Sequence, residues 1–399
     1  MKKNRVFGGV LLVAGTAIGA GMIALPITSG AGGFFPSIIL LIACWVYMTT
    51  TAFLFLEATL WLERDVNIVT MAEHTLGLAG KVIGWILYLF LLYSLTTAYL
   101  AGCGAIFINT LETWAQISLP QWIGPIPFLI LFGFCIYLGT RPADYINRAL
   151  MLGLVITYAA LGTVLTPQVQ GSYLAHEDWG LVWSSLAIMV TSFGYHIIIP
   201  SLSYYLGYRK DLLKKTIIWG SILPLVVYIF WEVLVMGVVP NAGPDGLVAL
   251  ANSAHPEVDL ITTINTNTHS LNIGEILRFF TYFAILTSFL GVSLSLHDFL
   301  ADGLKIKKTN KGRFFLTLLT FLPPLFFSLF FPNVFVSALK YAALFVATLL
   351  GILPAVMVWS GRYRLKIESQ FRVIGGKWVL VGVILISLAV IVVDLMDQF

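Results

Sequence analysis

The sequence predicts an all-α protein that crosses a membrane many times. Of its 399 residues, 59% are hydrophobic and only 11% are charged, and the mean hydropathy is +0.92. Because a soluble domain carries about 25% charged residues, this composition excludes a soluble enzyme, a nucleic-acid-binding protein and a disordered scaffold. Apolar windows of about 20 residues, the length that crosses the hydrocarbon core, recur along the whole chain. The basic residues gather in every second connection between these windows.

Eleven of these windows qualify as membrane spans. They are apolar all round, whereas the strands of a membrane barrel alternate apolar and polar side chains over about ten residues. The spans are therefore expected to be helices. In chain order they cover residues 6–29, 34–57, 82–112, 123–140, 147–166, 181–206, 216–239, 273–300, 314–331, 335–358 and 374–395.

The distribution of Lys and Arg predicts the orientation of the spans. All of these residues except Arg278 and Lys340 fall in the N-terminal segment or in alternate connections, and basic connections stay in the cytoplasm. A miscounted span would make the bias switch sides along the chain, and it does not. We therefore expect a cytoplasmic N-terminus and an external C-terminus.

The three cysteines, Cys44, Cys103 and Cys135, lie inside spans without a Cys-x-x-Cys spacing. Neither a disulfide framework nor a zinc site is predicted.

Spans 1 and 6 are interrupted by glycine and polar residues. Residues 14–26 read Ala-Gly-Thr-Ala-Ile-Gly-Ala-Gly-Met-Ile-Ala-Leu-Pro, and residues 191–200 read Thr-Ser-Phe-Gly-Tyr-His-Ile-Ile-Ile-Pro. Both contain Thr-x-x-Gly, with a proline nine or ten residues after the threonine. The second break lies five spans after the first, and an odd number of spans per unit makes the second unit run through the membrane in the opposite direction.

Interrupted helices at matching places in two halves indicate the binding site of a secondary transporter. An unwound stretch frees backbone N–H and C=O groups, which membrane depth tolerates only where they line a cavity or meet a ligand. The N-terminus of a half-helix attracts a carboxylate, and free carbonyls attract an ammonium. An amino-acid zwitterion offers both groups. For the glycines alone a second interpretation stays open, because Gly15-x-x-x-Gly19 is also a helix-packing motif.

Four segments carry a resemblance to a known family: residues 13–22, 93–99, 191–196 and 287–291. The chain resembles the hydroxy/aromatic amino acid permeases of the amino acid–polyamine–cation superfamily over essentially its whole length, and these four segments are the most specific parts of the resemblance. The resemblance implies one transmembrane transport domain, 1–399, with a LeuT-like 5+5 inverted repeat and broken helices 1 and 6. Repeat one covers about 6–166, repeat two about 181–358, and an eleventh, peripheral helix about 374–395.

The same resemblance implies a cation-coupled importer in a bacterial inner membrane. Tyrosine is the favoured substrate, and tryptophan or serine/threonine are the alternatives. By position, the backbone N–H groups of Ala20 and Gly21 receive the substrate carboxylate. Carbonyls near Ala17, Val190 and Ser192 hold the ammonium, and side chains of spans 3 and 6 enclose the aromatic ring. The implied substrate-binding residues are Ala17, Gly19, Ala20, Gly21, Tyr93, Thr97, Val190, Ser192, Phe193, Tyr195 and His196.

The coupling ion stays open between a proton and sodium. The permeases that this chain resembles are generally proton symporters, which favours the proton. Ionisable residues inside spans are costly and indicate function, so His196 and Glu232 are candidate proton carriers; for Glu232 a structural hydrogen bond is the other interpretation. In sodium-coupled relatives an ion lies at the positions of Thr287 and Ser288, together with carbonyls of Gly15, Ile18 and Ala284.

Two other classes of membrane protein are disfavoured. A membrane-embedded enzyme needs convergent catalytic groups, and the sequence contains neither His-Glu-x-x-His nor Gly-x-Ser-x-Gly. A channel is expected to show rings of charge or repeated carbonyl filters, whereas broken helices in inverted halves favour alternating access. We expect an amino-acid substrate and the lipid bilayer as partners, with no nucleic acid, no obligate protein partner and no cofactor beyond the coupling ion.

Overall fold

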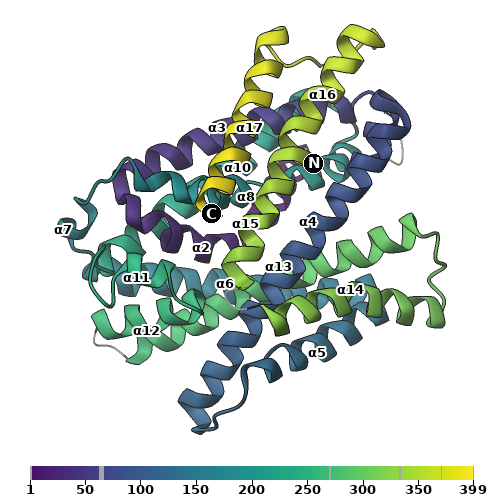
Figure 1. Cartoon of the computed structure of the whole chain (residues 1–399). Coiled ribbons are helices and arrows are strands. Elements are labelled where there is room, and N and C mark those ends of the chain that lie inside the picture. Colours follow the sequence, from purple (N-terminus) through teal and green to yellow (C-terminus); the bar gives the residue numbers. More distant parts are fainter. Residues whose placement is uncertain (1, 63–66, 269–270, 332–333, 370, 399) are drawn as a thin grey trace.

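The structure is a computed structural model of the chain (Figure 1), and it describes residues 2–62, 67–268, 271–331, 334–369 and 371–398. Within these ranges all regular secondary structure is helical. Ten helices are long and apolar enough to cross a membrane, and one bent pair of helices brings the number to eleven. Each of the eleven predicted spans corresponds to one of these segments, so the all-α polytopic class is confirmed.

The first five spans occupy the N-terminal half of the chain. They are formed by α1 (Lys2–Ala17) with α2 (Gly21–Ser29), α3 (Phe34–Thr59), α4 (Ile68–Ala115), α5 (Pro125–Leu138) and α6 (Thr140–Leu165).

The remaining six spans follow after a connection that contains α7 (Gly171–Leu174). They are formed by α8 (Leu186–Ser192) with α9 (Ile199–Tyr205), α10 (Lys210–Val238), α13 (Leu271–Gly303), α14 (Asn310–Phe330), α15 (Val334–Val346) with α16 (Leu353–Trp359), and α17 (Gly376–Gln398). A π-helical turn, Ala347–Ile352, joins α15 to α16. Two short helices, α11 (Leu247–Ala251) and α12 (Pro256–Thr268), lie between α10 and α13.

The helix α4 contains a kink that separates its first two turns from the long membrane-crossing part. Asn67 and Thr70 form a capping box at its start, in which each side chain accepts the other residue's backbone N–H at 2.9 Å. Gly77 has φ +71° and ψ −157°, a conformation that only glycine adopts without strain. The predicted span 82–112 lies wholly within the part after this kink.

The broken helices lie in the middle of the bundle. Figure 1 shows α2 and α8 at its centre, with α5 and α14 together on one side. All residues from Met22 to Ser29 in α2 are buried, whereas the outer helices expose large apolar side chains such as Phe134 on α5 and Leu152 on α6. Exposed apolar side chains on the outside are expected where the solvent is lipid. Around the centre, α1 packs along α10, and α13 packs against α6 and α4.

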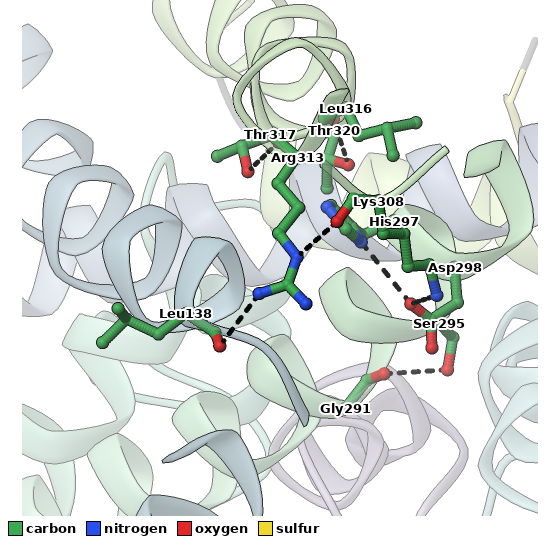
Figure 2. Close-up of polar contacts among 10 residues, drawn as sticks. All are labelled: Leu138, Gly291, Ser295, His297, Asp298, Lys308, Arg313, Leu316, Thr317 and Thr320. Carbon is green, nitrogen blue, oxygen red and sulfur yellow. Dashed lines mark hydrogen bonds and ion pairs between the residues drawn. The ribbon is translucent and has the colours of Figure 1, made fainter. Parts of the chain in front are cut away.

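Basic residues brace one end of the bundle, at the connection between α13 and α14 (Figure 2). Arg313 donates to the carbonyl of Lys308 at 3.1 Å and to the carbonyl of Leu138 at 3.4 Å, which connects this segment to the end of α5. Lys308 in turn forms an ion pair with Asp298 at 2.9 Å. We call this end, where the Lys- and Arg-rich connections lie, the basic end.

A buried ion pair lies at the last turn of α3. Glu57 is 0% exposed, accepts a hydrogen bond from Arg362 at 2.6 Å and accepts the backbone N–H of Val373 at 2.8 Å. The pair therefore connects α3 to the segment between α16 and α17.

Candidate substrate-binding site

The first break lies between α1 and α2, whose axes differ in direction by 54°. An added Cβ at Gly19 would lie only 2.1 Å from the Ser288 Oγ on α13, so glycine is needed for this close approach. The same Oγ accepts the backbone N–H of Ala20 at 3.1 Å, so this N–H, which is predicted to receive the substrate carboxylate, is already bonded within the protein. An added Cβ at Gly15 would meet only the end of the Met151 side chain, at 3.6 Å. Of the two glycines in the Gly-x-x-x-Gly motif, only Gly19 is therefore a close contact.

The second break lies after α8. The N–H groups of Phe193 and Gly194 turn back to the carbonyls of Val190 and Thr191, at 3.2 and 3.0 Å. A short 3₁₀ turn, Tyr195–Ile198, then leads into α9. Pro200 occupies the first turn of α9, where the missing N–H of proline removes no helical hydrogen bond.

A tyrosine of α10 joins the two breaks. The hydroxyl of Tyr228 lies 2.6 Å from the carbonyl oxygen of Ala17 and 3.0 Å from that of Ser192, and it donates its proton between them. Its ring meets that of Phe193 edge to face, with 5.4 Å between the centroids. The carbonyls that end α1 and α8 therefore converge on a single point in the bundle.

A cavity of about 450 Å³ adjoins this point, within the range of roughly 300–1,000 Å³ typical of small-molecule sites. Its lining includes only the first residue of α2 and the last two of α8. It extends toward the basic end along α6, α9 and α13, where Asn147, Ser201 and Ser295 line it. Thr16, Ser201 and Gly291 are exposed, so solvent reaches the cavity from that end.

The structure brings the backbone of both breaks and the hydroxyls of span 8 to this one cavity. The predicted residues that line it are Gly15, Ala17, Ile18, Gly19, Ala20, Gly21, Ser192, Thr287 and Ser288.

The predicted side chains of span 3 lie outside this lining. The Tyr93 hydroxyl donates to the carbonyl of Leu319 on α14 at 2.8 Å, and Thr97 donates back to the carbonyl of Tyr93. Tyr88 and Tyr99 of the same helix line the cavity instead.

The predicted aromatic residues of span 6 also lie outside it. Phe193, Tyr195 and His196 are each 0% exposed. The His196 Nε2 lies 2.8 Å from the Thr51 hydroxyl on α3, and the Tyr195 hydroxyl donates to Thr49 at 3.3 Å. This pair therefore faces α3 rather than the cavity. Val190 is buried, and its carbonyl already accepts the Phe193 N–H.

The two hydroxyls of span 8 differ in what they can offer an ion. Thr287 donates to the carbonyls of Phe283 and Ala284, at 2.9 and 3.1 Å, and Ser288 donates to Ala284 at 3.1 Å. Ser288 also accepts the Ala20 N–H, whereas Thr287 has no hydrogen-bond donor among the described residues. Ala284 is 0% exposed and lies behind the wall of the cavity.

Glu232 lies away from the cavity, between α10 and the end of α2. It is 0% exposed, and the Ser29 hydroxyl lies 3.0 and 3.1 Å from its two carboxyl oxygens. The structural hydrogen bond, which is the other interpretation of the role of Glu232, is therefore present.

The site residues that the sequence reasoning missed are side chains whose direction depends on packing. Tyr228 and Tyr99 are the main ones; Asn147, Thr191 and Ser295 add polar groups to the wall. Tyr99 falls within a segment already singled out by the family resemblance, but no motif marks Tyr228.

Broken helices that meet at a central cavity place the chain in the LeuT-like fold class of membrane proteins, and a solved structure shares this fold. MhsT, crystallised in complex with L-phenylalanine, superposes with a TM-score of 0.65 over 98% of both chains, at 15% sequence identity. The predicted LeuT-like fold is confirmed.

Within this class, the chain belongs to the tryptophan/tyrosine permease family, which matches residues 2–394. Tyrosine-specific transport system 2 of Haemophilus influenzae is 33% identical, with 100% of this chain and 98% of the relative covered. The low affinity tryptophan permease of Escherichia coli K12 is also 33% identical, with 98% and 95% covered. The predicted family is confirmed, and the protein is a transporter rather than an enzyme.

Proposed function

We propose that the protein imports tyrosine by cation-coupled symport with alternating access. The observation that carries this proposal is the convergence of both broken helices on one solvent-reached cavity at Tyr228. Tyrosine and tryptophan carriers both occur among its relatives. Polar side chains along the cavity, from Asn147, Thr191 and Ser295, favour a substrate with a phenol hydroxyl, since a buried hydroxyl needs a partner.

The zwitterion fits the two breaks in one orientation. Its carboxylate lies at the start of α2, next to the N–H groups of Gly19 and Gly21, where the helix dipole favours an anion. Its ammonium lies at the carbonyls of Ala17 and Ser192, beside the Tyr228 hydroxyl that now donates to both. The aromatic ring occupies the part of the cavity lined by Tyr99 and apolar residues of α15.

The orientation of the chain gives the cavity a direction. We place the basic end in the cytoplasm of a bacterium, with the chain in the plasma membrane, the N-terminus inside and the C-terminus outside. The cavity extends from the two breaks toward the basic end. With the basic end in the cytoplasm, this conformation corresponds to the state that releases substrate inward.

The proton is the proposed coupling ion, with Glu232 as its carrier. A proton on this carboxyl would change the bond that holds Ser29 at the end of α2 to α10, and would thereby link protonation to the position of a half-helix. Sodium is the second candidate, because Thr287 keeps an acceptor oxygen on the cavity wall beside Gly15 and Ile18.

Uptake by the purified protein in liposomes tests this proposal. We expect labelled tyrosine to accumulate under an inward proton gradient, and unlabelled tyrosine to compete better than tryptophan, phenylalanine or serine. Accumulation driven only by a sodium gradient would move the coupling site to Thr287 and Ser288. Absence of uptake under both gradients would contradict the substrate assignment.

A further inference from the structure

A buried carboxylate, that of Glu257, lies outside the central cavity. Glu257, the second residue of α12, is 1% exposed. Neither of its carboxyl oxygens accepts a hydrogen bond from any group that the structure describes. Its nearest basic group is the Nδ1 of His255, at 3.7 Å, which is too long for a hydrogen bond. The other acid nearby, Asp259, is held by Ser253.

Packing alone does not account for a carboxylate in this position. A buried charge that has an ion-pair partner only at 3.7 Å, beyond hydrogen-bond distance, is still costly, and the favourable effect of a helix N-terminus on an acidic residue is small by comparison. Burial raises the pKa of the Glu257 carboxyl, and the contact with Glu257 raises the pKa of His255. Burial therefore disfavours the charged form of the Glu257 carboxyl, and a bound cation would favour it.

Glu257 faces a second cavity, of about 360 Å³. We call it the α12 cavity; among the described residues it has no lining residue in common with the central one. Aromatic rings form much of its wall, from Trp122, Phe330, Phe331 and Phe335. Trp122, Phe330 and Phe331 are more than half exposed, so the cavity can be reached from outside the bundle.

This wall selects the class of ligand. One carboxylate among aromatic rings suits an organic ammonium ion, because the ammonium forms a charge-assisted hydrogen bond with the carboxylate and a cation–π contact with the rings. A divalent metal ion needs several oxygen or nitrogen ligands, and the described residues contain no group of three His, Cys, Asp or Glu that could hold one. A ligand that carried a carboxylate of its own would be repelled by the Glu257 carboxylate.

We propose that the α12 cavity is a binding site for aromatic monoamines, in which Glu257 binds the ammonium and the Trp122, Phe331 and Phe335 rings enclose the aryl group. The site is separate from the proposed transport site and has the opposite preference: it takes an amine without a carboxylate and excludes the zwitterionic amino acid.

Calorimetric titration of the purified full-length protein with 2-phenylethylamine tests this proposal. We expect saturable binding that phenylalanine at the same concentration does not displace, and at least a tenfold loss of affinity in Glu257→Gln. Glu112→Gln is the matched control, since Glu112 is an exposed acid near the end of α4, and it should bind like the wild type. Phe331→Leu, at an exposed position, should weaken binding about threefold without a folding defect.

The pH dependence provides a second readout. Because the pKa values of Glu257 and His255 are both raised, the amine should bind more tightly at pH 8 than at pH 6. Two other titratable groups lie close to Glu257, namely Asp259 and the Cys103 thiol of α4, and a negative charge on either one would also favour a cation. Equal affinity in wild type and Glu257→Gln, displacement by phenylalanine, or absence of binding would each overturn the proposal. None of these outcomes affects tyrosine uptake, which tests the transport site.

Discussion

Replacing Gly19 by alanine is expected to damage the first break directly. The new Cβ would lie 2.1 Å from the Ser288 Oγ and 3.4 Å from the Ser288 Cβ. The serine side chain must therefore turn away, which breaks its 3.1 Å bond to the Ala20 N–H, or the break must move away from α13. Either change displaces the N–H groups that are proposed to receive the substrate carboxylate.

The size of the effect follows from these two contacts. Overpacking of this kind costs about 1–3 kcal/mol, and the lost hydrogen bond about 0.5–1.5 kcal/mol. Together the two contributions amount to about 1.5–4.5 kcal/mol. Since substrate binding must restore the strained arrangement, even the lower value raises the Kd about tenfold.

Binding of labelled tyrosine to the purified variants measures this change. Gly382→Ala is the matched control, because an added Cβ there has nothing within 4 Å, and its Kd should equal that of the wild type. Ser288→Ala removes the clashing oxygen, so the double variant Gly19→Ala/Ser288→Ala should bind about as well as Ser288→Ala alone. A wild-type Kd for Gly19→Ala, or a double variant as weak as Gly19→Ala, would refute this reasoning.

Three further substitutions test other parts of the account. Tyr228→Phe leaves the carbonyls of Ala17 and Ser192 unpaired in the substrate-free protein, at a cost of about 1–3 kcal/mol; the melting temperature should fall, and tyrosine, whose ammonium pairs with these carbonyls, should raise it more than it raises that of the wild type, whereas an equal rise would count against the ammonium position. His196→Gln removes a bond to Thr51; the melting temperature should fall while the order of competing amino acids in uptake assays stays the same, and a changed order would restore His196 to the pocket. Glu57→Gln leaves Arg362 without its buried partner, so unfolding should become easier by about 3–5 kcal/mol; a Tm equal to that of the wild type would contradict this.

The spans and the breaks could be predicted because their signals are local. Each span is an apolar window in the sequence, and the Gly-rich stretch 14–21 is itself the first break. Backbone groups at a break are present whatever the side chains are. For this reason the predicted residues that line the cavity are mainly backbone positions, such as Ala17, Gly19 and Gly21.

The side chains around the substrate could not be predicted in the same way. Span 3 is apolar all round, so the sequence does not show which face of the helix meets the cavity. Tyr93 and Thr97 share one face, because residues four apart are neighbours on a helix, and the Tyr93 hydroxyl on that face bonds to α14. Tyr88 and Tyr99 lie on the face that meets the cavity.

The second break shows a related limit. The 3₁₀ turn after Gly194 turns Tyr195 and His196 toward α3, and only the threonines at 49 and 51 in span 2 hint at this pairing. Tyr228 reaches the breaks from a helix more than 30 residues further along the chain. Such a contact depends on how the helices pack, which no local pattern in the sequence records.

An experimentally determined structure of the protein with tyrosine bound tests the central claim most directly. We expect the carboxylate of tyrosine within hydrogen-bond distance of the N–H groups at the start of α2, and its ammonium at the carbonyls of Ala17 and Ser192. Tyrosine bound instead against Tyr93, or against Tyr195 and His196 at α3, would contradict the assignment of the site.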